Sequence, residues 1–353
     1  LLSRRQRQMC IRDSSNRAII GKWHLGHTRK VHYPINRGFS HFYGHLNGAI
    51  DYFDHMREGE LDWHNDWETC YDKGYSTELI TQEAVRCINT YEKEGPFLLY
   101  VAYNAPHTPL QAQEKDIELY CDDFGSLTPK EQKRVTYQAM VSCMDRGIGT
   151  IVDALKKKGI MDNTFLIFFS DNGPAGVPGS SSGKLRGRKF DEWDGGVRVP
   201  AVFYWKRAES NYKNLSSQVT GFVDIVPTLK ELVGDKNRPE RAYDGISILP
   251  LLIGSTSCID RNFYLGCGAV VNKDYKLIRK GRKPGLNLPQ DFLVDYQTDP
   301  YEKKNASNGN EQIVRSLYQV ALKYDTITPC LPEIPYGKGR EGFKAPVEWK
   351  VTR

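Results

Sequence analysis

Apolar runs alternate with amphipathic stretches along the first two thirds of the chain. Residues 17–21 (RAIIG) have the pattern of a short buried strand, and residues 96–103, 164–173 and 197–205 form further apolar runs of strand length. The runs at 96–103 and 164–173 are continuous, which is typical of strands buried on both faces of a parallel sheet. Residues 22–75 follow neither period and are predicted to be loop-like.

Two stretches between these runs show helical spacing. Residues 76–93 start with a Ser-Thr pair and place apolar residues on one helical face. Residues 128–158 open with Thr128-Pro129, a cap and a first-turn proline, and end at Gly159. The alternation of strands and helices predicts an α/β fold with a largely parallel sheet covered by helices.

The pattern changes near Asp260. Short alternating stretches with turns follow, and then a helical stretch at about residues 311–325. They predict a small C-terminal subdomain with an antiparallel sheet and a helix, followed by an extended tail. The expected organisation is therefore a leader at 1–14, an α/β domain at 15–258, and the subdomain and tail at 259–353.

The net charge of +6 is unevenly distributed over the 353 residues. Residues 1–14 carry four arginines against one aspartate, half of the excess, without helical or strand periodicity. A basic arm for nucleic acid or targeting is one interpretation; a non-native leader is the favoured one. The rest of the chain is too weakly basic to indicate nucleic-acid binding, and no apolar run reaches the roughly 20 residues of a membrane span.

Cysteines and glycosylation sequons say little about the compartment. The eight cysteines include no CxxC pair, which argues against a zinc ribbon or a thioredoxin-type motif. Without Cys10, seven remain, enough for a few disulfides and one free thiol. Sequons at Asn214 and Asn305 are compatible with an exported protein.

Polar residues follow three of the predicted strands, where ligands gather in parallel sheets. In GKWHLGH (21–27), Lys22 and His24 can present two cationic donors to one oxyanion, although a strand-end lysine is often only solvated. In YNAPHTPL (103–110), two prolines bracket His107. A fixed imidazole suits a general acid; a loop histidine stacked on its prolines is the alternative.

The third strand ends in SDNG (170–173). Asp171 and Asn172 offer adjacent hard oxygen ligands for Ca²⁺ or Mg²⁺, but a turn would also favour Asp-Asn-Gly. The stretch at 184–200 then brings four basic residues beside Gly-Gly, and by default they form a solvated face. The members are Lys184, Arg186, Arg188 and Lys189.

All eight histidines lie between residues 24 and 107, without the HExxH spacing of a zinc site. Five of them are expected to be surface or hydrogen-bonding residues: His32, His41, His45, His55 and His64. The candidate residues would hold a hard cation and supply two lysines and two histidines, but no internal nucleophile. This combination indicates transfer of a tetrahedral oxyanion group, sulfuryl or phosphoryl.

Six segments, in the same order, resemble the formylglycine-dependent sulfatases, most closely arylsulfatases of the A and B type. They cover roughly residues 15–310 and read GKWHLGH, GFSHFYGHLNGAIDYF, YVAYNAPHTPLQA, FFSDNGP, LRGRKFDEWDGGVRVP and DYQTDPYEKKN. The resemblance implies an alkaline-phosphatase-like α/β fold, bound calcium, and cleavage of sulfate esters by sulfuryl transfer to a formylglycine hydrate.

The resemblance also implies roles for single residues. Lys22 and His24 match residues that contact the formylglycine hydrate and the sulfate, and His107 matches the histidine that protonates the leaving alcohol. Lys189 matches the lysine that holds the sulfate and the leaving oxygen, with Lys184 as the alternative.

The calcium site and the nucleophile are where this sequence departs from the family. Asp171 and Asn172 match two calcium ligands, Asp171 also lying close to the nucleophile. The family's strand with two metal-binding aspartates and its Cys/Ser-x-Pro/Ala-x-Arg motif are not found, and Cys10 in QMCIRDS does not fit. We expect an N-terminally truncated chain, joined to its leader near Ser14 or Ser15, with an incomplete calcium site and no turnover of its own.

Two other functions are weighed beside a sulfuric ester hydrolase. One is a phosphodiesterase or phosphatase of the same superfamily, and the other is a non-catalytic binder of sulfated glycans. The expected partner is a sulfate-ester small molecule or a sulfated glycan, selected by the loop at 44–75 with Trp63 and Trp67. The family implies a lysosomal, secreted or periplasmic location.

Overall fold

A computed structural model describes residues 16–350 except 93–94, 207, 209–217, 238, 240, 328–337 and 339. The predicted leader, Cys10, Asn214 and Cys330 lie outside the described residues. The chain divides into two compact units. The first unit comprises Leu1–Thr164, Asp235–Ala242 and Glu341–Arg353, and the second comprises Phe165–Gly234 and Tyr243–Arg340. The domain boundary near residue 258 stays a prediction.

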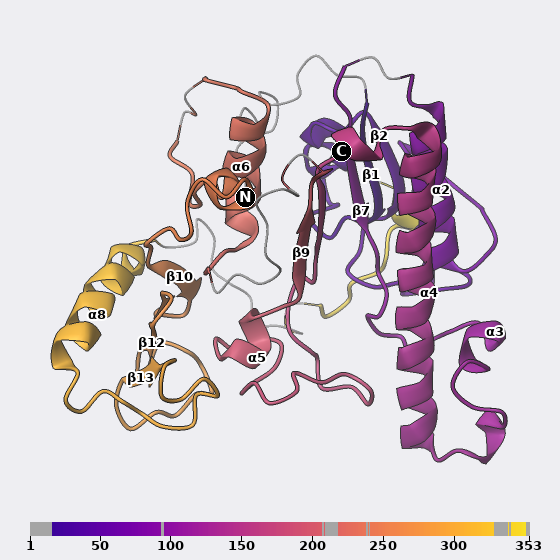
Figure 1. The fold of residues 1–353 in the computed structure, drawn as a ribbon. Coiled ribbons are helices and arrows are strands. Elements are labelled where there is room, and N and C mark those ends of the chain that lie inside the picture. Colours follow the sequence, from indigo (N-terminus) through magenta and orange to yellow (C-terminus); the bar gives the residue numbers. More distant parts are fainter. Residues whose placement is uncertain are drawn as a thin grey trace. The chain divides into compact units, whose positions relative to one another are not determined.

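The first unit is built on a five-stranded sheet (Figure 1). Its order is β6 (Glu68–Thr69), β5 (His64–Asn65), β2 (His41–His45), β1 (Arg17–Lys22) and β7 (Leu98–Ala102). β1 runs parallel to β2 and β7, whereas β5 and β6 are antiparallel additions. β3 (Met56–Arg57) and β4 (Glu60–Leu61) pair separately.

Helices cover one face of this sheet. α2 (Ser76–Thr90) and α4 (Pro129–Lys158) pack there, and Ile20 and Ile80 lie in the shared core. The adjacent Ile19 faces the opposite side, with Trp23 and Phe42, because successive strand residues point to opposite faces. Short elements complete the unit: η1 (Lys30–His32), η2 (Pro34–Arg37), α3 (Glu114–Ile117), η3 (Phe124–Ser126), η4 (Met161–Asn163) and η7 (Val347–Trp349).

The ends of α4 agree with the sequence prediction. The Thr128 backbone N–H donates to the Glu131 carboxylate at 2.9 Å, and Thr128 Oγ1 accepts from the Glu131 N–H, which completes a capping box. Gly159 ends the helix in the left-handed conformation with φ of 71°. Local capping chemistry therefore fixes both ends of this helix.

Two predictions about the first sheet are wrong in detail. The stretch predicted as loop contains β2, a strand of the parallel core, whose alternating polar residues and Gly44 hide its period. The run at 96–103 is not buried on both faces, since β7 is the last strand in this sheet and Tyr100 is 46% exposed.

The second unit begins with β8 (Leu166–Phe169), which pairs with β9 (Ala201–Tyr204). The pair is antiparallel, so the prediction that these strands continue a parallel sheet is wrong. A parallel neighbour needs a crossover, usually a helix over the sheet. The connection between β8 and β9 contains only the four-residue helix α5 (Asp194–Val197).

The predicted antiparallel subdomain is confirmed in the second unit. β10 (Phe263–Gly266), β11 (Ala269–Val271), β12 (Tyr275–Ile278) and β13 (Phe292–Asp295) form a sheet in that order. α8 (Glu311–Asp325) packs Leu317 and Ala321 on one face, and Trp193 packs on the other. The remaining helices are η6 (Phe222–Asp224), α6 (Ile225–Leu232) and α7 (Leu249–Leu252).

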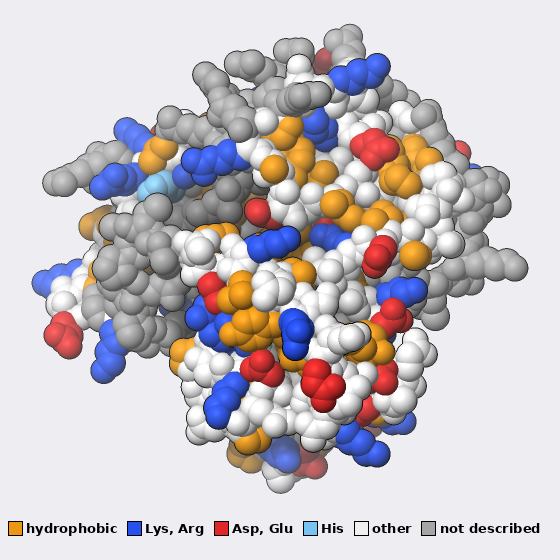
Figure 2. Space-filling model, turned by 90° about the vertical axis from the view of Figure 1, so that its left-hand side faces the viewer, with side chains coloured by type: hydrophobic (Ala, Val, Ile, Leu, Met, Phe, Trp, Pro, Cys, Tyr) orange, Lys and Arg blue, Asp and Glu red, His pale blue; other side chains and the backbone are white. Residues whose placement is uncertain are grey.

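The structure adds to the sequence observations on cysteines, sequons, membrane spans and surface charge. The six cysteines among the described residues are all free thiols. The Asn305 side-chain amide donates to the Asp291 carbonyl at 2.9 Å. Within the described residues, no helix is long and apolar enough to cross a membrane. Basic and acidic side chains are interspersed over the lower half of Figure 2.

Candidate functional site

Three backbones approach closely where β1 ends. Gly21 has φ of 102°, and a Cβ built there would lie 2.1 Å from the Ala102 carbonyl oxygen of β7. Gly44 of β2 is equally close to the Gly21 carbonyl oxygen. Only glycine fits such an approach. It brings the ends of β1 and β7 to the same edge of the sheet, with Lys22 the last residue of β1 and His107 in the loop that follows β7.

Trp23 anchors the loop that carries Lys22 and His24. Its side chain is buried, and its indole N–H donates to the carbonyls of Gly26 and His32, both at 3.0 Å. The backbone N–H of His24 donates to the Leu46 carbonyl at 3.1 Å. Trp23 therefore has a structural role in GKWHLGH. Lys22 and His24, on either side of it, stay the predicted site residues of this segment.

A glycine makes room for the His24 ring. A Cβ built on Gly48 would lie 2.6 Å from the imidazole Cε1 and Nε2 atoms. The His24 backbone has φ of 46°, a region that non-glycine residues adopt uncommonly and mostly at turns or functional sites. The conformation of His24 thus depends on the absence of a side chain at residue 48.

His107 is held by the loop after β7. The buried Tyr52 hydroxyl is shared between the carbonyls of Asn104 at 2.8 Å and His107 at 2.9 Å. His107 Nδ1 lies 2.7 Å from the Thr108 carbonyl oxygen and donates to it. This bond fixes the tautomer, with the proton on Nδ1 and the lone pair on Nε2.

In the second unit, backbone contacts join the segment after Asp171 and Asn172 to the loop that carries Lys189. The Lys189 backbone N–H donates to the Pro174 carbonyl at 2.9 Å, and the Gly173 N–H donates to the Gly196 carbonyl at 2.9 Å. A Cβ on Gly173 would lie 1.9 Å from the Gly195 carbonyl oxygen, so these two loops touch through glycine backbones.

The Asp-Asn pair has the donor atoms that a hard cation prefers. Asn172 Nδ2 donates to the Gly173 carbonyl at 2.9 Å, which leaves the amide oxygen as the ligand atom. The Asp171 side chain is exposed and supplies a carboxylate. The chemistry fits calcium, but two residues provide only part of the 6–8 oxygens it takes.

Three of the four basic residues of the following loop have different surroundings. The Arg186 guanidinium lies 3.5 Å from the Trp193 ring centroid and donates to the Glu302 carbonyl at 2.7 Å. Arg186 is therefore a packing residue. Lys184 is exposed near the Tyr301 ring, whereas Lys189 is half-buried beside the Asp-Asn turn.

Comparison with known proteins identifies the family. The sulfatase family model matches residues 15–235, more than half of the chain. The chain belongs to the sulfatase family. Its alkaline-phosphatase-like α/β fold agrees with this membership.

Two curated relatives match this sulfatase chain over only part of their own length. It is 35% identical to mouse arylsulfatase J over 240 residues, which covers 65% of the chain and 39% of that protein. It is 31% identical to mouse N-acetylgalactosamine-6-sulfatase over 252 residues, which covers 67% of the chain and 46% of the relative. The chain thus spans less than half the length of these two relatives.

Solved structures share the fold of the sulfatase chain. Ps i-CgsB in complex with k-i-k-neocarrahexaose has a TM-score of 0.75 at 26% identity, covering 91% of this chain and 74% of the other. BT4656 in complex with D-glucosamine-2-N,6-O-disulfate has a TM-score of 0.67 at 19% identity, covering 91% and 82%.

The sulfatase chain contains a buried ionic cluster that the sequence did not predict. Lys276 of β12 is fully buried, and its ammonium binds the carboxylates of Asp194 and, at 2.7 Å, Glu302. The Tyr296 hydroxyl donates to Asp194 at 2.8 Å. Burial raises the pKa of the Glu302 carboxyl, although the Lys276 ammonium opposes the shift. The cluster ties the end of the Lys189 loop to the C-terminal sheet.

The expectation that His45 is a surface or hydrogen-bonding histidine is wrong. It lies in register with Lys22, is fully buried, and neither ring nitrogen has a hydrogen-bond partner among the described residues. Burial lowers the pKa of His45 to about 4, with Asp62 opposing and Lys22 and His24 adding to the shift. His45 is thus a neutral imidazole beneath the lysine and histidine of the sulfatase motif.

Other loop residues have structural roles. Trp63 is fully buried in the core of the first unit and stacks on His55, so its expected role in substrate selection is wrong. Trp67 stacks on Tyr33 and keeps 40% of its surface exposed. His64 bonds Asp62, as expected for a hydrogen-bonding histidine.

Proposed function

We propose that the whole protein is a sulfuric ester hydrolase of the arylsulfatase type and that Lys22, His24, His107 and Lys189 have catalytic or binding roles in its reaction. The observation that carries the proposal is that Lys22, His24 and His107 lie at one edge of a parallel sheet, held there by glycine contacts and Trp23. Lys189 is held in the second unit by the Pro174 carbonyl.

Each side chain has a defined task in this proposal. The Lys22 and Lys189 ammonium groups and the His24 imidazole donate hydrogen bonds to the sulfate oxygens, which are anionic throughout the reaction. His107 gives a proton from Nε2 to the leaving oxygen as its bond to sulfur breaks. The Nδ1 bond to Thr108 supports this direction of transfer.

A calcium ion would be held by Asp171 and Asn172 together with ligands from the rest of the protein. When bound, it supplies positive charge beside the sulfate group. The oxygen donors of these two residues are of the type that calcium prefers, which supports the proposal. Because there are only two of them, we expect calcium to bind weakly to this chain alone.

We also propose that the 353 residues alone do not turn over. Sulfuryl transfer in the sulfatase family needs an oxygen nucleophile derived from a Cys/Ser-x-Pro/Ala-x-Arg motif, and the sequence contains none. The donors that remain would bind and polarise a sulfate ester without a group that attacks it.

The test compares this chain with the whole protein encoded by its gene. We expect the chain to hydrolyse no aryl sulfate, and the whole protein to hydrolyse it in a way that a calcium chelator abolishes and added calcium restores. Turnover by purified 353-residue chain would overturn the proposed inactivity. A whole protein that cleaves phosphate esters but no sulfate esters would overturn the proposed function.

The proposed substrate class is a sulfated glycan. It is supported by two relatives: mouse N-acetylgalactosamine-6-sulfatase at 31% identity, and Ps i-CgsB at 26% identity, which was solved with a neocarrahexaose bound. A lysosomal, secreted or periplasmic location stays a prediction.

A further inference from the structure

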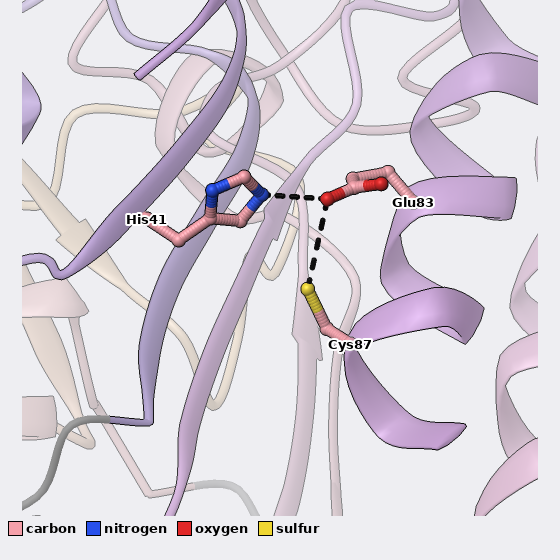
Figure 3. Close-up of side chains that lie close together, drawn as sticks. All are labelled: His41, Glu83 and Cys87. Atoms are coloured by element: carbon pink, nitrogen blue, oxygen red, sulfur yellow. Dashed lines mark hydrogen bonds and ion pairs between the residues drawn. The ribbon is translucent and has the colours of Figure 1, made fainter. Parts of the chain in front are cut away.

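Three potential metal ligands lie together at the start of β2, away from the residues assigned to the sulfate ester. His41 is the first residue of the strand, and Glu83 and Cys87 lie one turn apart on α2 (Figure 3). Spacing of i and i+4 puts the last two on the same helical face. Since Lys22 pairs with His45 and Ala18 with His41, the cluster lies about 13 Å along the strands from Lys22.

The three side chains point toward one another in a partly buried space, as Figure 3 shows. His41 Nε2 lies 2.6 Å from Glu83 Oε1, which lies 3.9 Å from Cys87 Sγ, and all three donor atoms are within 4.8 Å of one another. Ligand atoms around tetrahedral zinc are about 3.3–3.7 Å apart, given metal–ligand bonds of about 2.0–2.3 Å. Side-chain adjustments of about 1 Å reach that arrangement.

An outer carboxylate orients the histidine. Asp66 Oδ1 lies 3.0 Å from His41 Nδ1, so Nδ1–H donates to Asp66. Nε2 also carries a proton in the metal-free chain and donates it to Glu83 at 2.6 Å, and a metal ion would displace this proton and take the Nε2 lone pair. A carboxylate behind a histidine is the usual second partner in zinc sites, where it fixes the tautomer and raises the basicity of the ligand.

Cationic groups balance the cluster in the absence of a metal. Arg86 Nε donates to Glu83 Oε2 at 2.7 Å, and Arg86 Nη2 lies 3.5 Å from His41 Nε2. The Arg86 side chain is 54% exposed and can turn outward. Burial, with Glu83 adding to it, raises the pKa of the Cys87 thiol to about 11, so the sulfur is protonated near neutral pH.

We propose that His41, Glu83 and Cys87 form a binding site for a zinc-class divalent metal ion, with Asp66 as the outer partner of His41. Nitrogen, oxygen and sulfur donors together favour zinc or cobalt over calcium and magnesium, which take oxygen ligands. Binding converts the Cys87 thiol to a metal thiolate and releases its proton to solvent, and also the His41 proton where one is present. The fourth position takes a water molecule.

The experiment titrates tag-free 353-residue chain with Co²⁺ and follows the thiolate-to-cobalt charge-transfer absorption. We expect one equivalent to bind with this band, and Zn²⁺ to displace it. Cys87→Ser should abolish the band and weaken Co²⁺ binding by about 100-fold, and Asp66→Asn should weaken binding by about 10–100-fold while keeping the band. Cys143→Ser, a change at a buried thiol of α4, is the matched control and should leave the titration unchanged.

Each other result overturns the proposal. A titration without a thiolate band means that the cluster is an ion-pair network alone, and a band that survives in Cys87→Ser places the metal at another cysteine. If Cys87→Ser does not keep the melting temperature of the parent chain, Glu83→Gln takes its place. This variant must still weaken Co²⁺ binding by about 10-fold or more, and unchanged binding refutes the site.

Discussion

Replacing Lys276 with methionine is expected to lower the free energy of unfolding of the second unit by about 3–5 kcal/mol. The Lys276 ammonium is fully buried between the Asp194 and Glu302 carboxylates. Methionine has a similar volume but removes the cation between two buried acidic groups, of which Asp194 keeps a 3.5 Å ion pair with the exposed Arg198. The loss follows from the charges left behind rather than from the strength of the ion pairs themselves.

Urea unfolding followed by the fluorescence of buried tryptophans, Trp193 among them, measures this effect. Lys273→Met is the matched control: this lysine sits three residues away and its side chain is 57% exposed, so a change of no more than about 0.5 kcal/mol is expected. If both variants unfold at the same urea concentration as the parent chain, the buried cluster does not stabilise the fold.

Replacing His107 with alanine in the whole protein is expected to lower kcat for sulfate-ester hydrolysis by about 10²–10⁴-fold. The proposed role is proton donation to the leaving oxygen, so the loss should be largest for an alkyl or sugar sulfate. It should shrink for an aryl sulfate with an acidic phenol, which departs without a proton. A purely structural histidine would not produce this dependence on the leaving group.

Steady-state rates on both kinds of ester check that prediction. Lys189→Ala should be similarly damaging on both, because the sulfate group is common to them. Lys184→Ala changes an exposed lysine of the same loop and should retain activity. Equal losses for His107→Ala on the two esters would refute its role as the acid, and unchanged rates for Lys189→Ala would refute its role in binding sulfate.

Local chemistry made much of the fold predictable. The capping box of Thr128 and the stop at Gly159 fix α4 without any long-range contact. β2 was missed because its partners, β1 and β5, are distant in sequence, and its buried face carries histidine as well as tyrosine. The direction of β9 depends on the path of the connecting loop, which periodicity does not encode.

Some residues of the candidate site could also be predicted from local sequence, and others could not. Lys22, His24, His107 and Asp171 were predicted as site residues because they lie at or just after the ends of strand-like runs, and Lys189 because its segment resembles a sulfatase motif. Lys276 and His45 were not, because each lies inside a short strand where a polar residue is expected to face solvent. Their burial comes from what packs on that strand: the Trp193 loop over Lys276, and Trp63 beside His45.

The central claim is that Lys22 and His107 act on one sulfate ester, and a double-mutant cycle in the whole protein tests it most directly. Lys22→Ala, His107→Ala and the double variant are compared by kcat/KM on one alkyl sulfate, with melting temperatures to confirm folding. If both side chains act on the same sulfate ester, we expect a strongly non-additive cycle, in which the double variant loses far less than the product of the single losses. Losses that multiply would place the two residues in independent sites and contradict the account.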